Sequence, residues 1–122
     1  ILQHRGPDDS GVGKIGNLML GHNRLSIIGL KNRHSKQPIV ENGNALIFNG
    51  EIYNYKLVSN QLKNDGIECG NYSDSEVLFK CLMHWGIEKT LKTIDGMFAF
   101  AFLSKKHGVF LARDRLGEKP LY

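Results

Sequence analysis

The dipeptide Asn49-Gly50 directly follows a short apolar run at residues 45–48. Asn-Gly is commonest as a two-residue hairpin turn. The same pair also suits an oxyanion hole, in which the Asn amide and a backbone N–H left accessible by Gly point at one oxygen. Helical spacing begins soon afterwards, at Tyr55, and this weighs against the returning strand that a hairpin requires. On these residues alone both interpretations stay open.

Two charged side chains could each bind a charged group of a ligand, Arg24 a carboxylate and Asp74 an ammonium group. Arg24 lies at the end of an expected strand, and its guanidinium can grip a carboxylate through two parallel hydrogen bonds, although a solvated surface charge explains it as well. Ser73-Asp74-Ser75-Glu76 opens a helical pattern, and Ser73 with Glu76 fits a capping box. Asp74 suits the helix dipole and would also bind an ammonium group.

Two loops combine charges with turn residues. The run His4-Arg5-Gly6-Pro7-Asp8-Asp9 is as typical of a site loop as of a polar surface turn. The segment 113–120, with its paired Arg and Asp charges and a Gly turn, indicates a fixed, hydrogen-bonded corner. For this corner the structural and the functional interpretation are equally open.

The cysteine and histidine residues do not predict a metal site or a nucleophile. Cys81 and His84 have C-x-x-H spacing, but no second ligand pair lies at a matching distance, and a structural zinc site needs four ligands. Cys81 falls on an apolar helix face, and Cys69 has no His near it in sequence. Walker-type and dinucleotide-binding Gly motifs are absent. We therefore expect no metal and no cofactor in this domain.

The periodicity of apolar residues places the elements that must position these groups. Residues 1–17 are expected to be loop, with strands at 18–26, 45–48, 96–103 and 109–113 and helices at 55–62, 77–85 and 87–94. As a strand, the segment 97–103 carries Phe on one face and Met, Ala and Leu on the other. A strand that is apolar on both faces is covered on both sides, which predicts stacked layers of sheets and helices.

Length and composition indicate one folded domain. The chain has 122 residues with 23% charged residues, six Phe and a net charge of +4, which argues against disorder. The basic cluster Lys31, Arg33, His34 and Lys36 has no interleaved aromatic residues, so we assign it to a surface loop and expect no nucleic-acid binding. The longest apolar run is too short to span a membrane, and two Cys suggest a reducing compartment. Because the chain opens without Met, we expect an excerpt of a longer protein.

Seven short motifs follow one another in a specific order. They are His4-Arg5-Gly6-Pro7-Asp8-Asp9, Gly21-His22-Asn23-Arg24-Leu25-Ser26-Ile27, Gln37-Pro38, Phe48-Asn49-Gly50-Glu51-Ile52-Tyr53-Asn54, Ser73-Asp74-Ser75-Glu76, Asp95-Gly96-Met97-Phe98-Ala99 and the closing run from Arg113 to Tyr122. Together they resemble the glutaminase domain of glutamine-hydrolysing asparagine synthetases, a group of class II glutamine amidotransferases. The resemblance covers essentially the whole chain and favours this branch over the glucosamine phosphate and phosphoribosylamine branches.

The resemblance implies an α+β fold of the N-terminal nucleophile hydrolase type, with four αββα layers in which two antiparallel sheets stack between helices. Residues 1–122 would be a partial glutamine amidotransferase type 2 domain. It would lack the N-terminal strand with its nucleophilic Cys and the C-terminal ATP-dependent synthetase domain. Cys69 and Cys81 lie in the wrong places to replace that nucleophile, so we expect the 122-residue chain alone to be inactive.

The resemblance also implies roles for individual residues. Asn49 and Gly50 would form the oxyanion hole that stabilises the reacting amide. The two charged groups at the other end of glutamine would be held by Arg24, with backbone groups around Leu25 and Ile27, and by Glu51 and Asp74.

The implied function is to bind glutamine and to supply ammonia for the ATP-dependent amidation of aspartate, with ATP and Mg²⁺ bound in the synthetase domain only. The implied partners are glutamine and that synthetase domain, with a homodimer as a further option, and no nucleic acid or membrane. The implied location is the cytoplasm. Two alternatives stay open: an amidotransferase domain that feeds a different acceptor synthetase, and a non-catalytic glutamine-binding domain.

Overall fold

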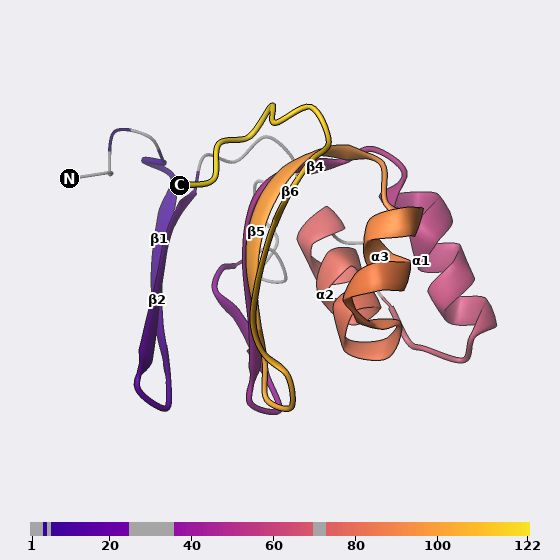
Figure 1. Ribbon diagram of the computed structural model, residues 1–122, viewed down its shortest axis with the longest axis horizontal. Coiled ribbons are helices and arrows are strands. Elements are labelled where there is room, and N and C mark those ends of the chain that lie inside the picture. The colour runs from indigo at the N-terminus through magenta and orange to yellow at the C-terminus, as the bar shows by residue number, and fades with distance from the viewer. Residues whose placement is uncertain (1–3, 5, 25–35, 70–72) are drawn as a thin grey trace.

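Six strands and three helices make up the described parts of the chain, which are residues 4, 6–24, 36–69 and 73–122 of this computed structural model (Figure 1). In chain order they are β1 (Asp9–Ile15), β2 (Leu18–Arg24), β3 (Ile39–Glu41), β4 (Asn44–Ile52), α1 (Tyr55–Asn64), α2 (Asp74–His84), α3 (Gly86–Thr93), β5 (Gly96–Ser104) and β6 (Gly108–Arg113). The strands form two antiparallel sheets: the hairpin β1–β2, and a four-stranded sheet in the order β3-β4-β5-β6.

Local sequence explains where the helices begin and end. α1 ends before Gly66, which has a φ of 78°, and the N–H of Ile67 then donates to the carbonyl of Leu62 at 2.9 Å. A Gly with positive φ directly after a helix is the usual way to end it. α2 begins after Ser73, whose hydroxyl oxygen accepts the N–H of Glu76 at 3.2 Å, so the expected cap is present. All three helices lie where the periodicity predicts them.

The three helices cover one face of the four-stranded sheet (Figure 1). The largest buried cluster lies between them and is formed by side chains that are each 4% exposed or less: Leu46, Phe48, Ile52, Leu78, Phe79, Leu82, Ile94, Phe98, Phe100 and Phe102. Full burial of one such side chain is worth about 1.5–3 kcal/mol. The contact between sheet and helices therefore stabilises the fold strongly, and it fixes the strands that carry the candidate residues.

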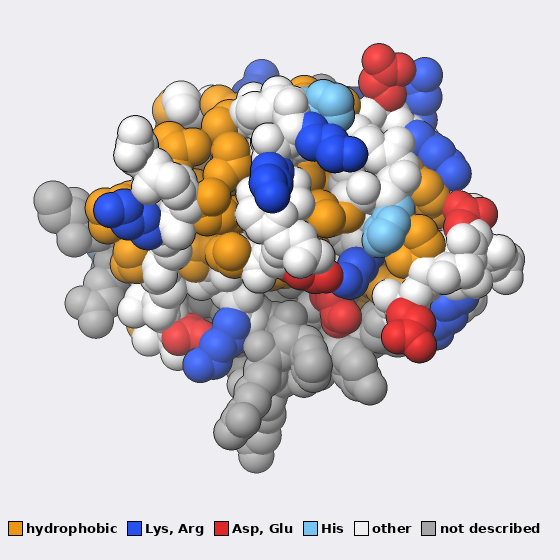
Figure 2. Space-filling view, turned by 90° about the horizontal axis from the view of Figure 1, so that it is seen from below, with side chains coloured by type: hydrophobic (Ala, Val, Ile, Leu, Met, Phe, Trp, Pro, Cys, Tyr) orange, Lys and Arg blue, Asp and Glu red, His pale blue; other side chains and the backbone are white. Residues whose placement is uncertain are grey.

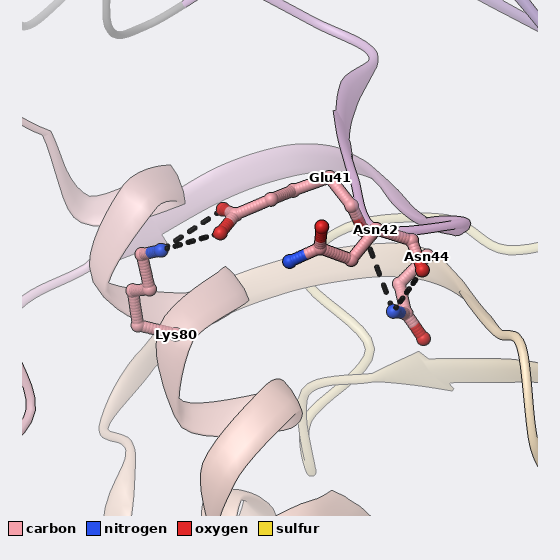
Figure 3. A network of polar contacts seen from close by, with 4 residues as sticks. All are labelled: Glu41, Asn42, Asn44 and Lys80. Carbon is pink, nitrogen blue, oxygen red and sulfur yellow. Dashed lines mark hydrogen bonds and ion pairs between the residues drawn. The ribbon is translucent and has the colours of Figure 1, made fainter.

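A polar contact ties the edge of this sheet to α2. The ammonium group of Lys80 donates to both carboxylate oxygens of Glu41, at 3.1 and 2.9 Å (Figure 3). The turn that follows, Asn42-Gly43, has φ values of 53° and 79°, the positive values of a type I′ hairpin. The side-chain amide of Asn44 closes the turn by donating to the carbonyls of Glu41 and Asn42 at 3.4 and 3.3 Å. The β3–β4 hairpin is thereby anchored to the helix layer.

The β1–β2 hairpin lies on the other face of the four-stranded sheet (Figure 1). A Cβ added at Gly11 would collide with the carbonyl oxygen of Gln37, and one added at Gly13 would lie 3.4 Å from Cγ of Pro38, so the backbones of the two layers meet closely here. Hairpin, sheet and helices confirm the expected α+β fold with two stacked antiparallel sheets. The helices of the described ranges all lie on one side of these sheets.

The strands differ from the sequence expectations at three places. Residues 1–17 are predicted to be loop, but Asp9–Ile15 form β1, because Gly11 and Gly13 admit a neighbouring backbone rather than mark a turn. β3 is not predicted, since three residues are too few to show alternation. β4 does not stop at Phe48 but continues to Ile52, so Asn49-Gly50 lies inside a strand and its hairpin interpretation is wrong. The other expected strands correspond to β2, β5 and β6.

Candidate active site

Side chains occupy the outer edge of β4 on both sides of Gly50. Two residues before it, the N–H of Phe48 donates to Oε1 of Gln37 at 2.6 Å. Two residues after it, the N–H of Ile52 donates to Oδ2 of Asp74 at 3.1 Å. Because alternate residues of a strand direct their N–H groups to the same side, the N–H of Gly50 points to this edge, between the two occupied positions.

The pairing with β5 supports this direction of the Gly50 N–H. Gly50 pairs with Phe98, whose own N–H donates to Oδ2 of Asp114 at 3.1 Å and whose carbonyl accepts the N–H of Asp114 at 2.8 Å. Phe98 thus directs its backbone groups away from β4, which identifies a pair without hydrogen bonds between its two members. The N–H of Gly50 is therefore not used by the sheet and is available to an oxygen at the edge.

The paired strands β4 and β5 approach each other unusually closely at Gly50. Gly50 has a φ of 150°, and a Cβ there would collide with the carbonyl oxygen of Met97 and lie 2.7 Å from Cα of Phe98. Gly96 has a φ of 157°, and its Cβ would collide with the carbonyl oxygen of Glu51. The position therefore requires glycine on both strands, and it fixes where the Gly50 N–H lies.

Asn49 and Glu51 lie on the face of β4 that is turned away from the helices. The side chain of Phe48 is buried between β4 and the helices. Side chains alternate along a strand, so its neighbour Asn49 lies on the opposite face, where it is exposed. Glu51 shares that face and is half-buried. The side-chain amide of Asn49 and the N–H of Gly50 are thus adjacent donors, as the oxyanion interpretation requires.

Asp74 lies at the start of α2 and is 9% exposed. Its Oδ1 accepts the N–H of Ser75 at 2.8 Å, and its Oδ2 accepts the N–H of Ile52, the residue after Glu51. Burial raises the pKa of Asp74, with a further rise from the neighbouring Glu51 carboxylate, while the hydrogen bonds from the backbone lower it. Two nearby carboxylates, one of them desolvated, favour a cation such as an ammonium group.

His22 joins the strand that carries Arg24 to the strand that carries Asn49. Nε2 of His22 lies 3.0 Å from the carbonyl oxygen of Phe48. A carbonyl only accepts hydrogen bonds, so Nε2 bears the hydrogen. Arg24, two residues further along β2, pairs with Asp9 as the last residue of the hairpin. The end of β2 is therefore held beside the part of β4 that contains the two donors.

Three of the expected contacts with glutamine lie outside the described residues. The structure describes the backbone of Arg24 but not its side chain, and it does not describe Leu25 or Ile27. The expected residues that it brings together are Asn49, Gly50, Glu51 and Asp74. Arg5 and most of the basic cluster at 31–36 are likewise outside the described ranges.

Asp114 builds the corner that the sequence indicates after β6. Its Oδ1 accepts the N–H groups of Leu116 and Glu118 at 3.1 and 2.9 Å, and its Oδ2 accepts those of Lys119 and Phe98 at 3.1 Å each. Desolvation works to raise the pKa of this carboxyl, but the hydrogen bonds from the backbone outweigh it and lower the pKa to about 2. The segment after β6 is thereby fixed to β5 at the position opposite Gly50.

Both cysteines lie in the second buried cluster, which α1 and α2 enclose. Cys81 is fully buried, and burial raises the pKa of its thiol to about 12. Cys69 is 5% exposed, and burial raises its pKa as well. A reactive thiol needs a lowered pKa and access to substrate, so neither cysteine has the properties of a nucleophile.

The described residues contain no group of three or more His, Cys, Asp or Glu side chains arranged to hold a metal ion. Within the same ranges, every helix is too short or too polar to cross a bilayer.

The sequence alone predicts no role for Gln37 or His22, although they lie in the motifs Gln37-Pro38 and Gly21–Ile27. Gln37 could have been found from the pairing of β3 with β4. Continuing the pairing of Ile39 with Leu46 back by two residues places Gln37 opposite Phe48. That argument needs β3, which is too short to be predicted.

Two stacked antiparallel sheets with helices on one outer face also occur in a solved amidotransferase structure. The glutamine phosphoribosylpyrophosphate (PRPP) amidotransferase of Bacillus subtilis, solved in complex with ADP and GMP, superposes with a TM-score of 0.71 and 23% sequence identity. The superposition covers 93% of this chain and 32% of that chain. At this identity the likeness shows the fold, which is that of an amidotransferase.

The chain belongs to the glutamine amidotransferase domain family, whose profile matches residues 1–122. Relatives include asparagine synthetase [glutamine-hydrolyzing] 3 of Bacillus subtilis, which is 35% identical over 99% of this chain, and asparagine synthetase [glutamine-hydrolyzing] 2 of Arabidopsis thaliana, which is 39% identical over 99% of it. The alignments span 20% and 21% of those two proteins, so the chain corresponds to about a fifth of their length. The family expected from the motifs is thereby confirmed.

Proposed function

We propose that the chain forms the glutamine-binding and oxyanion-stabilising part of a glutaminase domain in an asparagine synthetase. The observation that carries this proposal is the edge of β4, where the N–H of Gly50 and the amide of Asn49 are adjacent donors and the neighbouring N–H groups are already bonded. Two donors that converge on one oxygen stabilise the charge that develops when a glutamine amide is attacked.

The amino-acid end of glutamine is held by charges on either side of these donors. Glu51 and Asp74 attract the α-ammonium group, and the hydrogen bond from Ile52 to Asp74 supports their closeness. Arg24 pairs with the α-carboxylate at the end of β2, helped by backbone groups around Leu25 and Ile27. These five assignments are part of the proposal.

The nucleophile comes from a segment outside the 122 residues. A base takes the proton of its thiol, the thiolate attacks the amide carbon, and the carbonyl oxygen takes the negative charge. When the intermediate collapses, that proton passes to the departing nitrogen, which leaves as ammonia, and a glutamyl thioester remains for water to hydrolyse. Burial and the raised pKa values of Cys69 and Cys81 support an external nucleophile. By itself, the chain therefore releases no ammonia from glutamine.

The rest of the longer protein uses the ammonia to amidate aspartate, with ATP and Mg²⁺ bound there and not in this domain. The names of the relatives favour this acceptor over other synthetases and over a non-catalytic glutamine-binding domain. Glutamine and the synthetase part of the same protein are the partners in this proposal, with a homodimer as a further option and the cytoplasm as the location.

The proposal is tested in the protein that carries this chain together with its nucleophile, by following glutamate release from glutamine. Asn49→Ala should lower kcat about 10²–10³-fold, because one donor to the oxyanion is lost. Asn60→Ala, the same change at an exposed position of α1, should leave kcat as it is. An unchanged rate in Asn49→Ala refutes the oxyanion role. Ammonia release by the 122-residue chain above the level of its own Asn49→Ala variant refutes the external nucleophile.

A further inference from the structure

The side chain of Gln37 replaces a neighbouring strand at one position along β4. β3 begins at Ile39, and the place opposite Phe48 is filled by a side chain rather than by backbone. Oε1 of Gln37 accepts the N–H of Phe48 at 2.6 Å, and its Nε2 donates to the carbonyl of Phe48 at 2.9 Å. A primary amide has both a donor and an acceptor, so it reproduces the two hydrogen bonds of a paired strand residue.

The segment that carries Gln37 is held in turn by the β1–β2 hairpin. A Cβ at Gly11 would collide with the carbonyl oxygen of Gln37 and lie 3.1 Å from Cδ of Pro38, so β1 rests directly on this backbone. His22, which pairs with Gly11 across the hairpin, donates to the same carbonyl of Phe48 at 3.0 Å. Contacts from the hairpin and from Gln37 therefore meet on one peptide group, next to Asn49.

This arrangement decides where the oxyanion donor points. Asp74 holds the N–H of Ile52, and Gln37 holds both backbone groups of Phe48, so the strand is fixed on either side of Gly50. The carbonyl of Phe48 belongs to the peptide that joins Phe48 to Asn49, and the N–H of Gly50 belongs to the next peptide along β4. Without the bonds from Gln37 the first of these peptides would be held less firmly at the edge of the strand, and a tilt there would pass through Asn49 to the N–H of Gly50. A displacement of about 1 Å in a catalytic group can cost about 10²-fold in rate.

We propose that Gln37 is a positioning residue of the oxyanion hole: its amide holds the backbone of Phe48 so that the N–H of Gly50 points at the reacting carbonyl oxygen. This inference rests on the function proposed for the site. It adds a residue that acts through its hydrogen bonds to β4.

The kinetic test replaces Gln37 in the protein that carries the chain and its nucleophile. Methionine has a similar length to glutamine but makes neither hydrogen bond to Phe48. Gln37→Met should therefore lower kcat about 10–100-fold. KM for glutamine should change by less than about threefold, because the groups that hold the amino-acid end are left in place. Gln61→Met, the same change at an exposed position of α1, should leave both constants unchanged. Circular dichroism on the same samples gives the fraction of folded protein. If kcat falls only in proportion to that fraction, the proposal is overturned.

A second variant provides rescue and keeps the test valid where Gln37→Met does not fold. In Gln37→Glu, the ionised carboxylate still accepts the N–H of Phe48, but its second oxygen faces the carbonyl oxygen of Phe48 and repels it. When the carboxyl is protonated, its O–H can donate to that carbonyl as the amide of Gln37 does. The kcat of this variant relative to the wild type should therefore rise as pH is lowered through the titration of the new carboxyl. A constant ratio across pH overturns the proposal.

A structural readout separates this inference from the proposed function. The backbone amide resonance of Gly50 should shift in Gln37→Met and stay in place in Gln61→Met. A wild-type protein that hydrolyses no glutamine refutes the proposed function, whereas the Gly50 resonance still tests the positioning. An unmoved resonance, or a moved one with unchanged kcat, refutes the role of Gln37.

Discussion

At Gly50 the backbones of β4 and β5 approach more closely than a side chain allows. A Cβ there would lie 2.7 Å from Cα of Phe98 and collide with the carbonyl oxygen of Met97, and the φ of 150° is unfavourable for any other residue. Both obstacles are backbone atoms, which cannot move aside without parting the two strands. We therefore expect Gly50→Ala to reduce the free energy of unfolding by about 2–4 kcal/mol, measured by urea denaturation.

Gly66→Ala separates the collision from the conformational strain. Gly66 also has a positive φ, 78°, but a Cβ there would meet nothing within 4 Å. Its replacement should cost only the strain of the left-handed conformation, about 1–2 kcal/mol. Equal losses in the two variants would contradict the collision between β4 and β5 at Gly50.

The dipeptide Asn-Gly occurs twice in this chain with two different conformations. Asn42-Gly43 forms a hairpin turn of the type that is commonest for this dipeptide, with positive φ at both residues. Asn49-Gly50 continues a strand, because its neighbours Phe48 and Ile52 are buried against the helices. The dipeptide alone does not decide between a turn and a strand at Asn49-Gly50; the packing of distant helices does. The donor role of Asn49 could be proposed from sequence, whereas the direction of the Gly50 N–H depends on tertiary contacts.

Among the elements, the corner after β6 depends on a single carboxylate. The backbone N–H groups of Phe98, Leu116, Glu118 and Lys119 all donate to Asp114. A side chain that accepts several N–H groups keeps its charge at low pH, which explains the pKa of about 2. The sequence indicated a hydrogen-bonded corner here, and the structure confirms it.

The lowered pKa of Asp114 predicts how stability depends on pH. The ordinary pKa of Asp is about 3.9, so the unfolded chain takes up this proton at a higher pH than the folded one. The contribution of Asp114 is therefore complete above about pH 4 and is lost as pH falls towards about 2. Asp114→Asn should lower the urea midpoint above pH 4 and make it fall less steeply between about pH 4 and 2.

Asp95→Asn, at an exposed position just before β5, serves as the matched control and should keep the steep acid limb of the wild type. An acid limb in Asp114→Asn as steep as in the control would contradict the assignment.

The contribution of Asp74 to stability depends on pH in the opposite direction, because the pKa of Asp74 is raised. Its contribution is present at low pH and is lost as pH rises through its folded pKa.

Helices and strands are predicted correctly where apolar residues recur regularly over a long segment. They are not predicted where contacts between the layers, rather than such a pattern, determine the structure. The pattern of α2 and the cap at Ser73 were clear from sequence, as was the doubly apolar β5. β1 was missed because Gly11 and Gly13 resemble loop residues, although their lack of a side chain is what lets the segment carrying Gln37 lie against them. Such close approaches between sheets leave no periodic signal.

On the scale of the whole molecule, apolar burial is unevenly distributed between the two faces of the four-stranded sheet. Both buried clusters of the described residues involve the helices. On the other face, no residue of β1 is buried, and the hairpin leaves Val109 and Leu111 of β6 exposed by 54% and 61%. Figure 2 shows hydrophobic side chains at the surface over the half of the molecule that holds the sheets. The hairpin is therefore held by few contacts.

This uneven packing predicts that the hairpin opens before the rest of the fold. Amide protons of the β1–β2 ladder should exchange faster than those of the β4–β5 ladder, because regions with little buried apolar contact open locally. Gly11→Ala should reduce protection of β1–β2 by about a further 1–3 kcal/mol, since its Cβ would meet the carbonyl oxygen of Gln37. Gly21→Ala in the same hairpin, where a Cβ meets nothing within 4 Å, should change protection by less than about 0.5 kcal/mol. An equal loss of protection in every strand of Gly11→Ala would show instead that both sheets unfold as one unit.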